Sequence, residues 1–238
     1  IDHINSVEPF EDKPWIGIDN NKDSPHRGNI YVAWTKFDVY GSKKPEHKSH
    51  IFFSRSKDAG KSFSVPQRIS QAPGDCEDHS NTVEGAVPAV GPNGDVYVVW
   101  AGPKGLIFVK STDGGWTFGN EKPLGETPGG WSYSVKGLLR CNGMPITAVD
   151  PRNGRIYVNW SDLRNGDPDV FVISSSDGGE TWTKPTRVND DPIKNGKEQF
   201  FAWMAVDPID GAVNVAFYDR RDSAGTETSL TLARSVDG

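Results

Sequence analysis

The segment YDRR at 218–221 places a tyrosine, an aspartate and two arginines directly after an alternating apolar run. A guanidinium group binds a carboxylate through two parallel hydrogen bonds. A tyrosine beside charged groups can act as a nucleophile. Arg220 and Arg221 are therefore candidates for binding an anionic substrate, and Tyr218 is a candidate catalytic residue. The structural alternative is that Asp219 pairs with an arginine while Tyr218 packs at the end of its strand.

A second charged segment, SDLRNGDPD, occupies residues 161–169 and also follows an apolar run. Asp162 and Arg164 are candidates for binding sugar hydroxyls. Carboxylates are the oxygen ligands that calcium prefers, so Asp167 or Asp169 could hold a structural cation. Asn-Gly and Asp-Pro are also common turn formers, and turn chemistry is the favoured interpretation of these last two aspartates. No other cofactor and no catalytic metal is expected.

The segment CEDHSNTVEG at 76–85 holds three carboxylates and one histidine. Glu84 adjoins an apolar run, and a low-dielectric pocket there would raise its pKa into the range of a general acid or base. Glu77 and Asp78 are weaker candidates for the same role. A solvated acidic loop is the alternative. His79 has no second ligand at metal-binding spacing, so it does not predict a metal site.

Aromatic residues and cysteines complete the set of candidates. In GGWSYS, Trp131 and Tyr133 could form stacking platforms for a sugar ring, or they could pack over a loop as a lid. Cys76 and Cys141 both lie in predicted loops that precede an apolar strand. We expect these two cysteines to form a disulfide, which would imply an oxidising compartment, extracellular or periplasmic.

A repeated phrase shows which elements position these residues. It has the pattern Ser-x-Asp-x-Gly-x-Ser/Thr-Phe/Trp, and its aspartates are spaced by 55, 64 and 60 residues. These four aspartates are Asp58, Asp113, Asp177 and Asp237, the last in a phrase that stops at SVDG. Each phrase is preceded by a short apolar strand, a glycine turn and an alternating strand such as GDVYVVW. Four antiparallel strands in every 55 to 65 residues are typical of a β-propeller blade.

The repeats therefore predict an all-β fold, a β-propeller of four-stranded antiparallel blades. The whole chain, 1–238, is one incomplete propeller domain, with the fourth blade unfinished. The expected blades cover about 12–70, 84–124, 144–188 and 200–238. Further blades or a partner chain are needed to close such a propeller, because an open blade exposes apolar faces and strand edges.

The aspartate of each phrase has a structural explanation. An aspartate side chain accepts hydrogen bonds from the backbone N–H groups of its own turn, and glycine readily adopts positive φ. In a four-stranded blade these turns share one face with the short glycine turns. The long irregular loops, which carry all the candidates above, share the opposite face. Function tends to lie in such loops on a rigid scaffold.

The phrase resembles the Asp box, or BNR repeat, of the sialidase superfamily. Phrases such as RCNGMP, YVNWSD and FYDRR further resemble bacterial exo-α-sialidase-like proteins. The resemblance implies a six-bladed propeller and a secreted glycoside hydrolase that acts on glycans at the propeller axis. The chain reads KPWIGID where those enzymes carry an Arg-Ile-Pro motif. A non-catalytic propeller that binds a glycan or a protein partner is the alternative function.

Composition excludes other classes. The net charge is −6 and the basic residues are spread along the chain, so no clustered nucleic-acid footprint is present. No apolar stretch approaches the 18 residues of a membrane span. A carbohydrate is the expected partner.

Overall fold

The computed structural model describes residues 8–237, and every regular element among them is a β-strand. Three sheets have four strands in chain order, and each is antiparallel throughout. The first sheet contains β1 (Phe10–Ile18), β2 (Ile30–Phe37), β3 (Ser49–Ser56) and β4 (Gln67–Arg68). The second contains β5 (Glu84–Val90), β6 (Val96–Gly102), β7 (Gly105–Ser111) and β8 (Lys122–Gly125). The third contains β11 (Ile146–Val149), β12 (Ile156–Asp162), β13 (Asp169–Ser175) and β14 (Thr186–Arg187).

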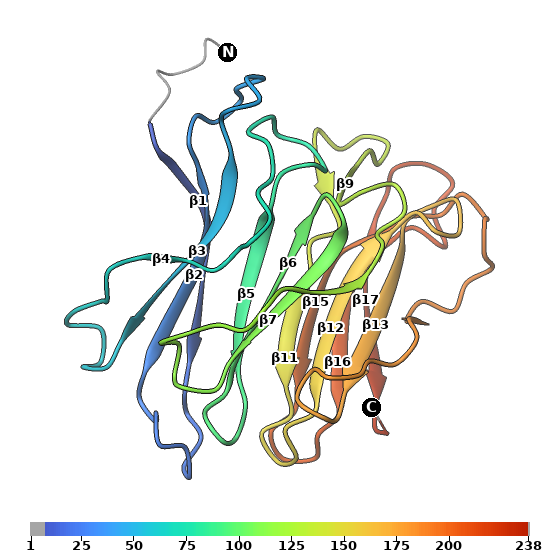
Figure 1. Ribbon diagram of the computed structural model, residues 1–238. Coiled ribbons are helices and arrows are strands. Elements are labelled where there is room, and N and C mark those ends of the chain that lie inside the picture. The colour runs from blue at the N-terminus through green and yellow to red at the C-terminus, as the bar shows by residue number, and fades with distance from the viewer. Residues whose placement is uncertain (1–7, 238) are drawn as a thin grey trace.

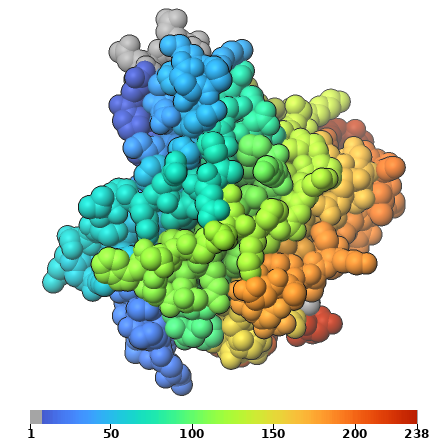
Figure 2. Space-filling model, viewed as in Figure 1, coloured from blue at the N-terminus to red at the C-terminus, as the bar shows by residue number. Residues whose placement is uncertain are grey.

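The fourth sheet has three strands, β15 (Gln199–Val206), β16 (Val213–Asp219) and β17 (Ser229–Ser235). A small hairpin of β9 (Ser132–Tyr133) and β10 (Cys141–Asn142) lies between the second and third sheets in the chain. The first three sheets follow one another across the molecule, and the fourth lies behind the third in this view and packs against it (Figure 1). The second blade lies between the first and the third (Figure 2). The predicted fold class, a partial β-propeller, is confirmed.

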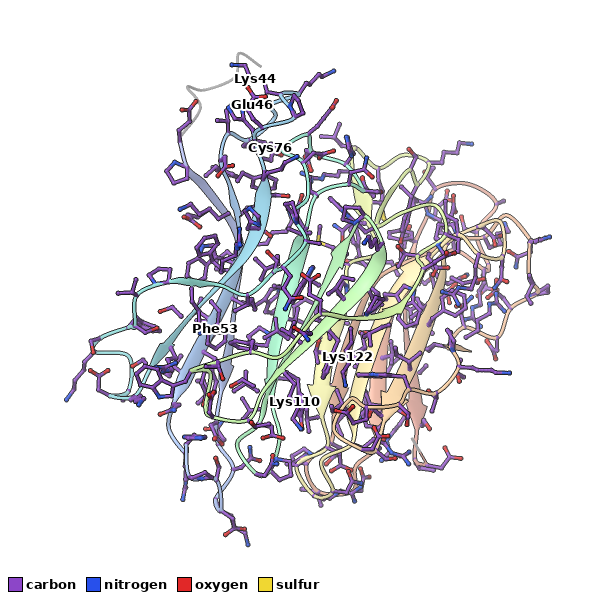
Figure 3. All side chains as sticks on the ribbon, in the orientation of Figure 1. Lys44, Glu46, Phe53, Cys76, Lys110 and Lys122 are labelled. Carbon is purple, nitrogen blue, oxygen red and sulfur yellow. The ribbon has the colours of Figure 1, made fainter. Side chains whose placement is uncertain are left out.

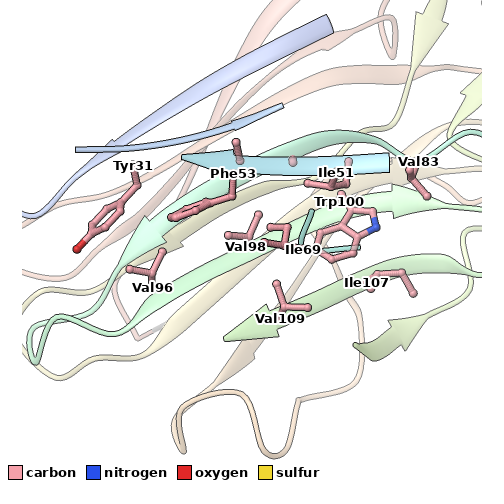
Figure 4. Close-up of a cluster of buried hydrophobic side chains, with 12 residues drawn as sticks. Tyr31, Ile51, Phe53, Ile69, Val83, Val96, Val98, Trp100, Ile107 and Val109 are labelled. Atoms are coloured by element: carbon pink, nitrogen blue, oxygen red, sulfur yellow. The ribbon is translucent and has the colours of Figure 1, made fainter. Parts of the chain in front are cut away.

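The core lies between neighbouring blades. Between the first and second blades, residues such as Tyr31, Phe53 and Trp100 interdigitate (Figure 4). Strand β2 alternates between partly and fully buried residues, because only one of its faces meets another blade. Strand β6 is buried at every position, because blades cover both of its faces.

The two end blades leave apolar side chains in solvent. On the first blade, Ile16 is 62% exposed, and on the fourth blade Trp203, Leu230 and Leu232 are 53%, 72% and 66% exposed. Patches of this kind normally mark an interface.

The turns with the Ser-x-Asp phrase have the predicted hydrogen bonds. At Asp113, Oδ1 accepts from Ser111 Oγ at 2.8 Å and from the backbone N–H of Thr117 at 2.9 Å, while Thr117 Oγ1 donates to Oδ2 at 2.6 Å. Gly114 and Gly115 have φ of +66° and +78°. Partial burial opposes ionisation, but the bonds from Thr117 and Ser111 outweigh it and lower the pKa of Asp113 to about 2. Asp58 and Asp177 accept equivalent bonds, and Ser235 Oγ donates to Asp237 at 2.7 Å.

Replacing Asp113 by asparagine should lower the Tm by roughly 2–4 °C, because an NH₂ group would face the donors of Thr117. The folded pKa of Asp113 is depressed, so its contribution is complete above the unfolded pKa of about 4. That contribution is lost as the pH falls toward 2. Thermal unfolding between pH 2 and 7 measures the difference in Tm between the native protein and Asp113→Asn. The exposed Asp23→Asn is the control. A difference that stays constant down to pH 2 would contradict this account.

Candidate functional site

The strand order separates two faces of the propeller. The Ser-x-Asp turns lie at one end of the sheets, here called the turn face. The opposite end, the loop face, carries the long segments 38–48, 69–83, 126–145 and 189–198. Lys44, Glu46 and Cys76 lie together at the loop-face end of the first blade (Figure 3). The innermost strand of every blade begins at this end.

Three of the four innermost strands are distorted near their loop-face ends. The register shifts between Asp12 and Trp15 in β1, between Glu84 and Val87 in β5, and between Phe200 and Trp203 in β15. The residue after the first of each pair has positive φ: Lys13 (+51°), Gly85 (+73°) and Phe201 (+50°). Bulges re-aim side chains, and left-handed residues other than glycine are uncommon outside functional sites and turns. The same position is therefore reshaped in three blades.

These distorted positions surround the loop-face end of the propeller axis. The rings of Trp15 on β1 and Trp203 on β15 meet with centroids 4.9 Å apart, so the first and fourth innermost strands lie next to each other there. Lys13 and Phe201 each lie two positions before these tryptophans. Phe201 and Trp203 are 39% and 53% exposed, so aromatic faces are available at the axis.

A buried ion pair lies at this end of the axis. The Lys13 ammonium donates to Asp12 Oδ2 at 2.6 Å and forms a short hydrogen bond with Glu84 Oε2. Thr82 Oγ1 donates to Glu84 Oε1 at 2.7 Å. The Glu84 side chain is fully buried, while those of Lys13 and Asp12 are 25% and 26% exposed. We call Asp12, Lys13, Thr82 and Glu84 the Glu84 cluster.

Burial governs the electrostatics of the cluster. It raises the pKa of Glu84, and the Lys13 ammonium only partly offsets this effect. Burial opposes the charge of Lys13 as well, but the carboxylates of Glu84 and Asp12 outweigh it and raise the pKa of Lys13. Glu84 thus meets the condition set for a general acid or base, a carboxyl group with an elevated pKa.

A second polar group adjoins the Glu84 cluster. Tyr40 donates its hydroxyl to Asp78 Oδ2 at 2.7 Å, and Arg140 binds the other oxygen of Asp78. Burial and the neighbouring Asp78 raise the pKa of Tyr40 to about 12. Asp78 and Arg140 both interact electrostatically with Glu84. Arg140 keeps a side chain that is 46% exposed, so its guanidinium can reach a ligand.

Asp162 and Arg164, predicted to bind substrate, bind each other. Arg164 Nε and Nη2 donate to Asp162 at 2.9 and 2.6 Å, and the guanidinium lies 4.3 Å from the ring centroid of Phe171. Arg164 lines a groove of about 330 Å³ with Trp160 and Glu126, where the second and third blades meet. The structure does not bring Arg164 into contact with the Glu84 cluster.

The YDRR segment repeats this arrangement one blade later. Arg221 Nε donates to Asp219 Oδ2 at 2.6 Å, so Arg221, not Arg220, is the counterpart of Arg164. Arg220 is 3% exposed and donates to the Lys136 carbonyl at 2.8 Å and to Thr228 Oγ1 at 3.1 Å. Both arginines are thus engaged by their own chain.

Tyr218 lies on the open face of the fourth blade and is 45% exposed. Its ring packs against Phe200 and Phe201, with centroids 5.7 and 6.3 Å away. None of these contacts reaches Glu84. The catalytic role of Tyr218 stays a prediction.

The structure does not support the predicted role of Trp131 and Tyr133 as stacking platforms for a sugar ring. Trp131 is 1% exposed and Tyr133 is 8% exposed, so neither presents a free face to a sugar. Tyr133 shares a hydrogen bond of 2.5 Å with Ser161 Oγ. The alternative, in which these rings pack against a loop, fits their burial.

The predicted disulfide is wrong. Cys76 and Cys141 are free thiols, each buried in its own surroundings. The Cys76 carbonyl accepts from the backbone of Gly41 in the first blade, whereas Cys141 packs with Tyr133 and Phe200. Burial raises the pKa of both thiols, that of Cys141 to about 11. The disulfide argument for an oxidising compartment therefore falls away.

The suggested cation ligands have protein partners instead. Asp169 accepts from Arg187 and Asn189, and Asp167 accepts from the backbone N–H of Gly196 at 2.7 Å. Across residues 8–237, no group of three or more His, Cys, Asp or Glu side chains is placed to hold a metal ion. In the same part of the chain, no helix is long and apolar enough to span a membrane.

Sequence reasoning missed Asp12, Lys13, Tyr40 and Arg140. A signal for the first two was present in the sequence. When the innermost strands of the repeats are aligned, Asp12 is at the position equivalent to Glu84. The same alignment makes Trp15 and Trp203 equivalent positions. Tyr40 and Arg140 lie in irregular loops, and no repeat register identifies them.

No protein-family model and no curated protein matches the chain. Similar solved structures include a Hadza microbial sialidase, with a TM-score of 0.58 and 16% identity over 95% of this chain and 44% of that one. An ulvan lyase bound to -[GlcA(1-4)Rha3S]- has a TM-score of 0.55 and 13% identity, over 94% of this chain and 55% of that one. The α-L-arabinofuranosidase from Podospora anserina, in complex with cellotriose, has a TM-score of 0.51 and 12% identity, over 99% of this chain and 66% of that one.

These similarities show a propeller fold of the kind found in glycoside hydrolases. They do not single out the sialidases, since a sialidase, an arabinofuranosidase and a polysaccharide lyase match to similar extents. The chain spans 44% to 66% of the length of these three structures.

Proposed function

We propose that the chain is the carbohydrate-active part of a propeller glycoside hydrolase, with its reaction centre at the Glu84 cluster. The observation that carries the proposal is a fully buried glutamate with a raised pKa, held beside a second carboxylate at the loop-face end of the axis. The structural neighbours include a sialidase, an arabinofuranosidase and a polysaccharide lyase, and these activities support a glycan substrate.

Two carboxylates are the usual equipment of glycoside hydrolysis. Glu84 is the general acid, which gives its proton to the leaving glycosidic oxygen. Asp12 is the second carboxylate, whose oxygen attacks the anomeric carbon as the glycosidic bond breaks, and a water that Glu84 deprotonates then hydrolyses the glycosyl ester. Both bind one ammonium, which keeps the two bound oxygens within about 5 Å of each other, close to the spacing of a retaining pair. Entry of a sugar displaces Lys13 from between them, and this further raises the pKa of Glu84.

The surrounding groups suit an anionic glycan. Arg140 is the exposed cation beside the cluster, and it takes the substrate-binding role first assigned to Arg164 and Arg220. Phe201 and Trp203 offer exposed rings at the axis for stacking on a sugar, in place of Trp131 and Tyr133. A sialidase-like reaction is the finer form of the proposal. A secreted location, extracellular or periplasmic, goes with it.

The test replaces Glu84 by glutamine. We expect kcat/KM to fall by at least ~100-fold on whichever substrate responds, because general acid catalysis contributes 10²–10⁴-fold. The panel includes an α-sialoside, an α-L-arabinofuranoside and a sulfated uronate polysaccharide. Glu180→Gln is the control, since Glu180 lies on the turn face in an exposed pair with Lys122. Full activity of Glu84→Gln with an unchanged Tm would refute the assignment.

The alternative, a propeller that binds glycan without turnover, is favoured by two observations. Lys13 closes the space between the carboxylates, and Arg220 and Arg221 are satisfied within the chain. Glycan binding without product formation, equal in the native protein and in Glu84→Gln, would support it.

A further inference from the structure

In the second and third blades, the aromatic residue of the Ser-x-Asp phrase packs against the preceding blade. Phe118, five positions after Asp113, meets Phe53 of the first blade edge-on with centroids 4.8 Å apart. Trp182, five positions after Asp177, meets Phe108 of the second blade edge-on at 5.4 Å. Phe63, the equivalent residue of the first blade, has no neighbouring blade of the described residues to pack against on that side and is 48% exposed.

On the third blade, the surface equivalent to those at Phe53 and Phe108 is an open groove of about 380 Å³. Tyr157 and Val172 in this groove occupy the strand positions that Tyr97 and Phe108 occupy in the second blade. Its apolar lining consists mainly of Tyr157, Val172, Val188, Val213, Val215 and Ala233. In the part of the chain that the structure describes, no aromatic residue from the fourth phrase fills it.

The fourth blade has an unpaired strand edge next to this groove. Its sheet ends at β17, whereas each of the other blades adds a fourth strand after its Ser-x-Asp turn. The fourth turn has already formed its first bond, from Ser235 Oγ to Asp237. The outer edge of β17 offers backbone groups for a further strand, and extended segments bind such edges readily.

We propose that this groove binds an outer blade strand, added antiparallel to β17, whose Trp or Phe inserts between the third and fourth blades. The occupant is a segment of the kind that follows the other three turns: Ser or Thr, then an aromatic residue five positions after the turn aspartate. Each of the two occupied acceptors receives such a residue, and the groove has the lining to receive a third.

The test appends a copy of Gly179–Val188 directly after Gly238, which places the copied tryptophan five positions after Asp237. Burial of one tryptophan should raise the Tm by about 4–8 °C. Hydrogen exchange at Leu230 and Leu232 should slow at least ~10-fold, because the edge of β17 becomes paired. The matched control is the same extension with alanine at the copied tryptophan.

A second control blocks the groove from inside. Ala233→Phe places a ring in the groove from β17 itself, so the tryptophan extension should add nothing to the Tm of this variant. Equal Tm and exchange for the tryptophan and alanine extensions, measured in unmodified chains, would overturn the proposal. So would an undiminished gain in Ala233→Phe. Neither result depends on catalysis, and the proposed function is unaffected by either.

Discussion

Replacing Lys13 by methionine is expected to lower the free energy of unfolding by about 3 kcal/mol at pH 8. The change leaves the buried Glu84 carboxylate without its cation, and removal of one partner from a buried pair typically costs 3–5 kcal/mol. The lower end applies because Lys13 keeps 25% of its side chain in solvent. Urea unfolding of the native protein and the variant gives the value.

The loss should depend on pH with a definite sign. Burial already raises the folded pKa of Glu84 above its unfolded value, and loss of Lys13 raises it further. An acid with a raised folded pKa destabilises the protein as the pH rises through that pKa. The deficit of Lys13→Met is therefore largest at pH 8 and shrinks as the pH falls and Glu84 takes up a proton.

Two further variants isolate the cause. Lys122→Met removes a lysine from an exposed pair with Glu180, 2.6 Å long, and should cost less than about 1 kcal/mol. The double variant Lys13→Met with Glu84→Gln should recover most of the stability, since no buried charge is left. A deficit of Lys13→Met that is the same at pH 5 and pH 8 would show that the ion pair is not its source.

Replacing Arg187 by methionine should have the largest effect on stability, a loss of about 4 kcal/mol. Arg187 joins two buried carboxylates, donating to Asp169 at 2.7 Å and to Asp191 at 3.0 Å. The side chains of Asp169 and Asp191 are 0% and 4% exposed. Without the guanidinium, two like charges face each other out of water, which is the costly case.

The effect should spread from the third blade to the fourth. Asn189 donates to Asp169 and to Gln199 of β15 at 2.6 Å each, and Gln199 donates to Asp219 of β16 at 3.0 Å. We therefore expect Arg187→Met to increase hydrogen exchange in β15 and β16 as well as in β14.

The exposed Arg234, paired with Asp210, supplies the control for Arg187. Arg234→Met should cost less than about 1 kcal/mol. A loss of under about 1 kcal/mol in Arg187→Met would show that the network is not important for stability.

Sequence analysis succeeded where structure is local. The turn around Asp113 is made by a serine two positions before it and a threonine four positions after it, and such bonds can be read from the spacing alone. The division into a turn face and a loop face follows from the order of the strands along the chain. These features depend on neighbours along the chain, so one repeat is enough to predict them.

The candidate site was predicted only in part. Glu84 was identified because the segment around it is unusually acidic, but its partner Lys13 lies 71 positions away. Bulges in β1 and β5 turn the two side chains toward each other, and no pattern in the sequence encodes those bulges. The sequence left open whether Trp131 stacks on a sugar or packs with a loop, because burial of a loop residue depends on what packs over it. Cys76 and Cys141 were taken for neighbours because they occupy similar places in adjacent repeats.

The sequence by itself therefore determined the blade fold, the turn chemistry and the face on which the charged loops gather. These properties are set by hydrogen bonds over a few residues and by the two-residue period of a strand. Only the tertiary structure decided which charges pair, which aromatic rings meet solvent and which cysteines stay apart. The physical reason is that these depend on contacts between blades, where a bulge or a crossover loop of a few residues redirects a side chain without changing the pattern from which the fold was predicted.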